Sequence, residues 1–211
     1  MQNFNPQGGF PPGLRWDILV SLRNKECVQM KYSPVKKLVI SAACIALCVV
    51  LPMVFHSFPG GGNVFLPMHI PVLLCGLMCS WPYGLVCGLL GTALSSVLTG
   101  MPPAAILPSM MVECAVYGCV SGLMMGLVHT RKTYLDLYIS MVTAMVAGRV
   151  ISGLAKSLIF TPGTAPFAWV TTSLVEGIPG IAIQLVLIPT LVFALMKARL
   201  IPQRYPKELS K

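Results

Sequence analysis

Four ionisable residues lie within long apolar stretches of the sequence: Glu113, Arg149, Lys156 and Glu176. An unpaired charge near the centre of a bilayer costs at least about 2.5–3.5 kcal/mol, so such residues face one another or a polar cavity. Carboxylates accept hydrogen bonds from amines and protonated ring nitrogens, whereas a guanidinium donates to hydroxyls and carboxylates. The four residues are therefore candidates for binding a small polar molecule inside a membrane.

Tyr117 and His69 add further polar groups to this candidate site. Tyr117 follows Glu113 by four residues, which is about one helical turn, so the two side chains share a helix face. His69 lies between two prolines in the sequence PMHIP at residues 67–71, and we expect the backbone there to be partly unwound. Because unwound backbone at membrane depth is tolerated mainly where it lines a cavity, Met68 and His69 are also candidates.

The sequence leaves two interpretations of the charges open. Two carboxylates and two cations can form an internal ion-pair network that only fixes the register of the helices. Alternatively, they form a polar pocket that opens outward. We favour the pocket because Glu113, Arg149 and Glu176 are expected at a similar depth, roughly 12–17 Å below the outer surface at 1.5 Å per residue. Uncharged loops rich in glycine and proline lie above them.

The composition indicates an integral membrane protein. Of the 211 residues, 55% are hydrophobic and only 10% are charged, and the mean hydropathy is +0.79. A soluble domain averages about 25% charged residues, so this chain has too few polar side chains to cover a soluble surface. The net charge of +9 comes from residues clustered outside the apolar stretches. That distribution follows the positive-inside rule, predicts contact with anionic lipid headgroups and disfavours nucleic-acid binding.

Hydropathy together with proline and glycine breaks predicts the fold class. We expect an all-α integral membrane protein, a compact bundle of six transmembrane helices with both termini cytoplasmic. An even number of spans places the two basic termini and the loop containing Arg131 and Lys132 on one side, as the positive-inside rule requires. The predicted spans are 36–55, 64–80, 82–99, 104–129, 135–160 and 168–196.

Residues outside the bundle form two basic segments in this interpretation. Residues 1–35 would be a cytoplasmic N-terminal segment with a possible interfacial helix, residues 36–198 the membrane domain, and residues 199–211 a basic cytoplasmic tail. Within the bundle, small residues at four-residue spacing predict close helix packing. They are Gly84 and Gly88, then Gly118, Gly122 and Gly126, and then Ser140, Ala144, Gly148 and Ser152.

The sequence lacks the motifs of common enzymes and of metal sites. It contains no P-loop and no serine-hydrolase or zinc-protease motif, so we expect no catalytic residues and no ATP hydrolysis by this chain. Its eight cysteines include no Cys-x-x-Cys pair. We interpret them as small apolar residues and expect neither a metal nor a cofactor.

Three short runs resemble the substrate-binding S components of energy-coupling factor (ECF) vitamin transporters. They are PMHIPVLLCG at residues 67–76, LTGMPP at residues 98–103, and Glu113 followed by Tyr117 and Gly118. The resemblance covers about residues 36–198. It looks closest to the branch assigned to pyridoxine, hydroxymethylpyrimidine and related small-ring precursors.

This resemblance implies a six-helix protein that captures a vitamin from outside with high affinity. Such proteins work with a transmembrane coupling subunit and two cytoplasmic ATPase subunits. In the family, an Ala-x-x-x-Ala motif on the first helix docks on the coupling subunit, and Ala42 and Ala46 match that motif. The family's first external loop, which corresponds to residues 57–67 here, gates a pocket formed largely by the fourth to sixth helices.

The resulting prediction is the high-affinity substrate-capture subunit of an ECF-type ABC importer in a prokaryotic plasma membrane. Its substrate would be a small water-soluble vitamin or precursor, with pyridoxine or hydroxymethylpyrimidine favoured. Two other classes remain open: a solitary carrier or channel that needs no ATPase, and a structural membrane protein whose ion pairs only hold its fold. The expected substrate-binding residues are Met68, His69, Glu113, Tyr117, Arg149, Lys156 and Glu176.

Overall fold

Six helices make up the described part of the chain. The computed structural model describes residues 32–56, 67–130, 132–157, 166–198 and 201, with the backbone alone for residues 56, 166–177 and 179. Within those ranges there are helices and turns but no strand, which confirms the all-α prediction. The helices are α2 (Pro34–His56), α4 (His69–Cys79), α5 (Trp81–Thr99), α6 (Leu107–Leu127), α7 (Thr133–Ala155) and α8 (Pro166–Lys197). The expected interfacial helix and basic tail lie outside the described residues.

Five of these helices contain an apolar segment long enough to cross a bilayer, namely α2, α5, α6, α7 and the second half of α8. Helix α4 differs because it has 11 residues, about 16 Å of helix, against a hydrocarbon core about 30 Å thick. The sequence predicts a full span over residues 64–80, whereas the described helix begins only at His69. A membrane protein with several spans is therefore confirmed, while six complete crossings stay a prediction.

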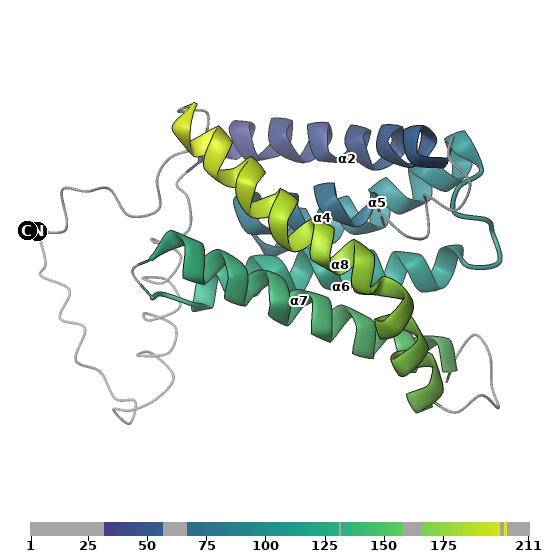
Figure 1. The fold of residues 1–211 in the computed structure, drawn as a ribbon. Helices are drawn as coiled ribbons and strands as arrows, with labels where there is room; N and C mark the ends of the chain where they lie inside the picture. The colour runs from purple at the N-terminus through teal and green to yellow at the C-terminus, as the bar shows by residue number, and fades with distance from the viewer. Residues whose placement is uncertain (1–31, 57–66, 131, 158–165, 199–200, 202–211) are drawn as a thin grey trace, which may run out of the picture.

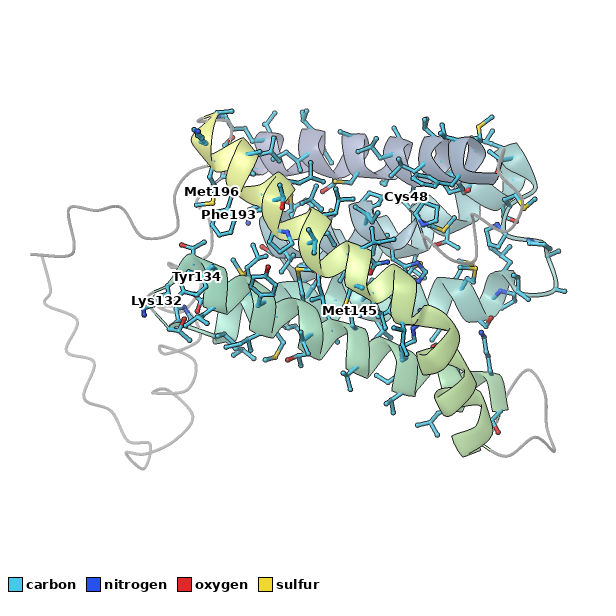
Figure 2. The ribbon with its side chains drawn as sticks, viewed as in Figure 1. Cys48, Lys132, Tyr134, Met145, Phe193 and Met196 are labelled. Atoms are coloured by element: carbon cyan, nitrogen blue, oxygen red, sulfur yellow. The ribbon has the colours of Figure 1, made fainter. Side chains whose placement is uncertain are left out.

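The connections between helices lie at two opposite ends of the bundle. The start of α2, the α6–α7 connection and the end of α8 lie at the left end in Figure 1, and the α5–α6 connection lies at the right end. Figure 2 shows Lys132 and Tyr134 at the left end together with Phe193 and Met196. Lysines also begin α2 and end α8, whereas residues 99–107 at the other end carry no charge. The bundle thus has one basic end and one neutral end.

The start of α2 is tied to the end of α4. Nζ of Lys37 donates a hydrogen bond to Oγ of Ser80 at 3.1 Å and lies 5.8 Å from the centre of the Tyr83 ring. Ser80 alone connects α4 to α5 and has a φ of 106°. Because Cys79 ends α4 beside the lysines, His69 at its other terminus lies toward the neutral end.

The α5–α6 connection is a sharp turn, as the sequence predicts. Gly100 ends α5 with a φ of 71°, a conformation that glycine adopts without steric cost. Hydroxyl groups then bond the turn to α5: Ser95 donates to the carbonyl oxygen of Met101 at 2.7 Å, and Ser96 donates to that of Pro102 at 2.8 Å.

Helix α6 occupies the middle of the bundle and packs against α4, α5 and α7. At the α5–α6 crossing the backbones touch, because a Cβ atom on Gly84 would overlap the carbonyl oxygen of Gly118, and one on Gly118 would overlap that of Gly84. Gly88 lies equally close to the backbone of Cys114. The predicted close packing is confirmed at these glycines. It is wrong for Gly126, which has no neighbouring atom within 4 Å of an added Cβ.

Buried thiols fill the space between α2, α4, α5 and α6. Sγ of Cys75 lies 3.5 Å from Oγ of Ser41, and Cys48 points from α2 into the bundle (Figure 2). No group of three or more metal-binding side chains is found among the residues described. The structure supports a role for the buried cysteines in helix packing. The buried cysteines are Cys44, Cys48, Cys75, Cys79, Cys87 and Cys114, and none of them forms a disulfide.

Candidate functional site

Glu113 is the centre of a buried polar cluster. Its atom Oε1 accepts a hydrogen bond from the Tyr117 hydroxyl at 3.2 Å. The same oxygen lies 3.4 Å from Nη1 of Arg149 and 3.6 Å from Nε2 of His69. Helices α4, α6 and α7 each contribute to this arrangement. We refer to His69, Glu113, Tyr117 and Arg149 as the Glu113 cluster.

His69 reaches the cluster from the first position of α4. Pro71 falls within the first turn, where its missing N–H would have no partner inside the helix, so the helix accommodates it. The backbone is helical from His69 onward, and Pro67 and Met68 directly before it form a turn. The His69 ring meets the Tyr117 ring edge to face, with centroids 5.0 Å apart.

Gly148 makes room for the ring of Tyr117. A Cβ atom at this position in α7 would overlap Cδ1 and Cε1 of that ring. The sequence assigns Gly148 only to a packing stripe and misses its part in the site. The available signal is that Gly148 directly precedes Arg149, a candidate site residue, in the sequence.

We expect Gly148→Ala to displace the Tyr117 ring and lower the stability of the protein. Forcing extra atoms into a packed interior typically costs about 1–3 kcal/mol. Thermal unfolding in detergent measures the effect. Gly126→Ala is the matched control because open space surrounds Gly126, and we expect it to melt as the wild type does. Equal melting of the two variants would show that Tyr117 does not pack on Gly148.

The remaining predicted residues lie at different distances from the cluster. Met68 is buried directly before His69, and its carbonyl oxygen accepts a weak hydrogen bond from Sγ of Cys48 at 3.8 Å. Lys156 caps the C-terminus of α7 and is close enough to add positive charge at Glu113. Glu176 belongs to α8, and its side chain lies outside the described residues.

Asp136 and Gln184 are both buried, although the sequence analysis selected neither of them. Gln184 of α8 is 2% exposed, although it lies in an apolar span. The search for charged residues overlooked it because an amide carries no formal charge. Its burial places a polar side chain of α8 inside the bundle, on the helix of Glu176, whose own side chain lies outside the described residues.

Three nitrogen atoms of the Glu113 cluster have no hydrogen-bond partner. They are Nδ1 and Nε2 of His69 and Nε of Arg149. Buried polar groups are usually hydrogen-bonded, and exceptions often mark binding sites. His69 is 1% exposed and Arg149 is 7% exposed, so bulk water does not satisfy them. The cluster therefore offers polar atoms without hydrogen-bond partners in the buried interior, which suits the binding of a polar small molecule.

Comparison with known proteins identifies the family. The family model described as "ECF transporter, substrate-specific component" matches residues 36–192, from the first turn of α2 well into α8. Neither a curated protein nor a solved structure matches the chain significantly. The family match covers most of the chain, including every residue of the Glu113 cluster. The chain therefore belongs to the family of ECF transporter substrate-specific components, and it is a multi-pass membrane transporter subunit rather than an enzyme.

Proposed function

We propose that the chain captures a small water-soluble vitamin or vitamin precursor and delivers it to an ECF importer of a prokaryotic plasma membrane. The observation that carries the proposal is the Glu113 cluster, a buried polar site with unpaired nitrogen atoms in a chain of this family. Resemblance of the sequence motifs favours pyridoxine or hydroxymethylpyrimidine. In this proposal residues 36–198 form the membrane domain, and the basic flanking segments lie in the cytoplasm.

The orientation follows from the two ends of the bundle. The basic end would face the cytoplasm, and the neutral end would face outward. Glu113 is six residues into α6, counted from Leu107, and Arg149 is six residues before Ala155 at the end of α7. Both lie about 9 Å along their helices from the neutral end. A ligand would therefore enter from outside and reach the cluster after a short path.

Thiol labelling tests this orientation. We expect Ala104→Cys to react with a membrane-impermeant maleimide in intact cells, and Lys132→Cys to react only after permeabilisation. Both positions are exposed, at opposite ends of the bundle. The background variant carries Cys27→Ser, and its own labelling is subtracted. Reaction of Lys132→Cys in intact cells would place the basic end outside and contradict the orientation.

The partners in this proposal are a transmembrane coupling subunit and two ATPases. Ala42 and Ala46 are exposed on α2 and lie about one turn apart, so a partner helix can approach closely there. We expect the double variant Ala42→Leu/Ala46→Leu to lose vitamin uptake and co-purification of the coupling subunit. Ligand binding by the isolated subunit should be retained, because these alanines are on the outside of the bundle.

Ala43→Leu is the matched control for the double variant. Ala43 is also exposed, but it lies about 100° around the helix from Ala42, so we expect assembly to be retained. Co-purification of the double variant at the wild-type level would show that the docking surface is elsewhere. Uptake by a wild-type chain that purifies without any ATPase would instead favour a solitary carrier.

A further inference from the structure

We infer that the ligand of the Glu113 cluster binds through an anionic oxygen group, a carboxylate or an acidic ring hydroxyl, and not through a cationic amine. This inference rests on the proposed function and specifies the chemical class of its substrate. Of the two favoured substrates, pyridoxine has an acidic ring hydroxyl and fits this class, whereas hydroxymethylpyrimidine does not. Three features of the described residues support it: the free edge of Arg149, the unpaired ring of His69 and the uncapped start of α4.

Arg149 presents an unused hydrogen-bond donor. Its Nη1 lies against Glu113, whereas its Nε–H has no acceptor. Nε–H lies on the guanidinium edge that grips a carboxylate through two parallel hydrogen bonds. The contact of Nη1 with Glu113 restricts the positions that the buried guanidinium can take. The edge bearing Nε is therefore oriented before a ligand arrives.

His69 supplies a second unpaired group beside Arg149. Nε2 lies 3.6 Å from Oε1 of Glu113, and neither ring nitrogen makes a hydrogen bond. With the ring doubly protonated, Nε2–H faces Glu113 and Nδ1–H is left to donate to a ligand oxygen. His69 and Arg149 both contact the same oxygen of Glu113, so one ligand group can reach both. An oxygen that accepts hydrogen bonds satisfies both residues together.

The start of α4 is the third feature. Met68 at the N-cap makes no side-chain hydrogen bond, and the first turn contains no acidic residue. The N-terminus of a helix carries partial positive charge and attracts anions. In membrane transporters, the N-termini of helices that start inside the bilayer commonly point at anionic substrate groups. Because His69 is the first residue of α4, this positive end lies at the cluster.

The position of Glu113 argues against a cationic ligand. Its atom Oε1 already contacts Tyr117, Arg149 and His69. An amine that took the place of Arg149 at Oε1 would leave that guanidinium buried without a counter-charge, which is strongly unfavourable. An anionic group that binds at the free edge of Arg149 leaves Glu113 in place as the counter-charge of that guanidinium.

Paired probe molecules test the inference on the full-length protein in detergent. Each pair differs in one group: pyridine-3-carboxylate and its carboxamide, pantothenate and pantothenol, and pyridoxine and its 3-O-methyl ether. Hydroxymethylpyrimidine and thiamin serve as neutral and cationic probes. We expect calorimetry to show that one anionic member binds about 10- to 100-fold more tightly than its blocked partner, the range of one charge-assisted hydrogen bond.

Variants assign this preference to the cluster. We expect Arg149→Met to reduce the preference of the acid over its partner by about tenfold or more, and His69→Gln to reduce it by a smaller factor. Arg149→Lys keeps the positive charge beside Glu113 but lacks the guanidinium edge. If Arg149→Met does not fold, the acid preference of Arg149→Lys is measured instead. His129→Gln is the control, because His129 lies beyond the end of α6 at the basic end. We expect this variant to show the acid preference of the wild type.

Three results would overturn the inference. They are tightest binding by a neutral or cationic probe, the absence of binding by every anionic probe, and an undiminished acid preference in Arg149→Lys. Co-purification distinguishes these failures from a failure of the proposed function. A chain that binds hydroxymethylpyrimidine most tightly and still assembles with the ATPases would be an ECF subunit with a different ligand class.

Discussion

Replacing Glu113 with leucine should lower the free energy of unfolding by about 3–5 kcal/mol, because Arg149 is then buried without its counter-charge. The hydroxyl of Tyr117 loses its acceptor in the same variant. The double variant Glu113→Leu/Arg149→Leu should recover most of this loss. Apolar replacement of both partners of a buried ion pair is often neutral or stabilising, whereas removal of one partner is not.

Denaturant unfolding in detergent compares the two single variants with the double variant. Lys197→Leu, an exposed lysine at the end of α8, is the control and should unfold as the wild type does. Ligand binding is measured on the same samples. We expect the double variant to regain stability without regaining affinity. If it regained both, the ion pair would be structural only, and the ligand would bind elsewhere in the bundle.

Substituting Gly118 with valine should prevent assembly of the bundle. A Cβ atom there meets the carbonyl oxygen of Gly84, and a helix backbone cannot rotate away as a flexible side chain does. The cost should therefore exceed the roughly 1–3 kcal/mol of ordinary overpacking. Gly84→Val should have the same effect from the other side of the contact. Both variants should yield little folded protein after extraction from membranes.

Gly126→Val is the control for these substitutions because it lies on the same helix in open space. We expect it to be folded, with at most a small change in melting temperature. Size-exclusion profiles and thermal unfolding of the three purified variants give the comparison. Normal melting of Gly118→Val would mean that α5 and α6 are farther apart than the structure places them.

The sequence predicts which residues belong to the site better than it predicts which of them contact one another. Depth along each span places Glu113 and Arg149 at one level, and the two side chains do meet. The same estimate places Glu176 at that level, so depth alone cannot identify the carboxylate that contacts Arg149. Pairing depends on the rotation of each helix about its axis, and nearly uniform apolar spans contain little information about that rotation.

Sequence patterns do not predict two features of the fold, the length of α4 and the atoms that the glycines contact. The stretch containing α4 is apolar throughout, and such a stretch does not distinguish a spanning helix from a short enclosed one. The glycine stripes predict close approach between helices, yet they do not say what approaches. Gly118 meets a backbone, Gly148 meets the Tyr117 ring, and Gly126 meets nothing. Those differences depend on the three-dimensional crossing of the helices.

The described helix α4 has 11 residues, fewer than the roughly 20 apolar residues typical of a transmembrane segment, so it is a weak insertion signal by itself. Ten of its 11 residues are buried by protein, so contact with acyl chains contributes little to holding it in place. Because only Ser80 separates it from α5, the two helices would enter the bilayer as a hairpin led by α5. α4 then becomes enclosed only after α6 has been synthesised, because α6 packs against it. The site around Glu113 is thus completed by folding within the membrane, after the insertion of its parts.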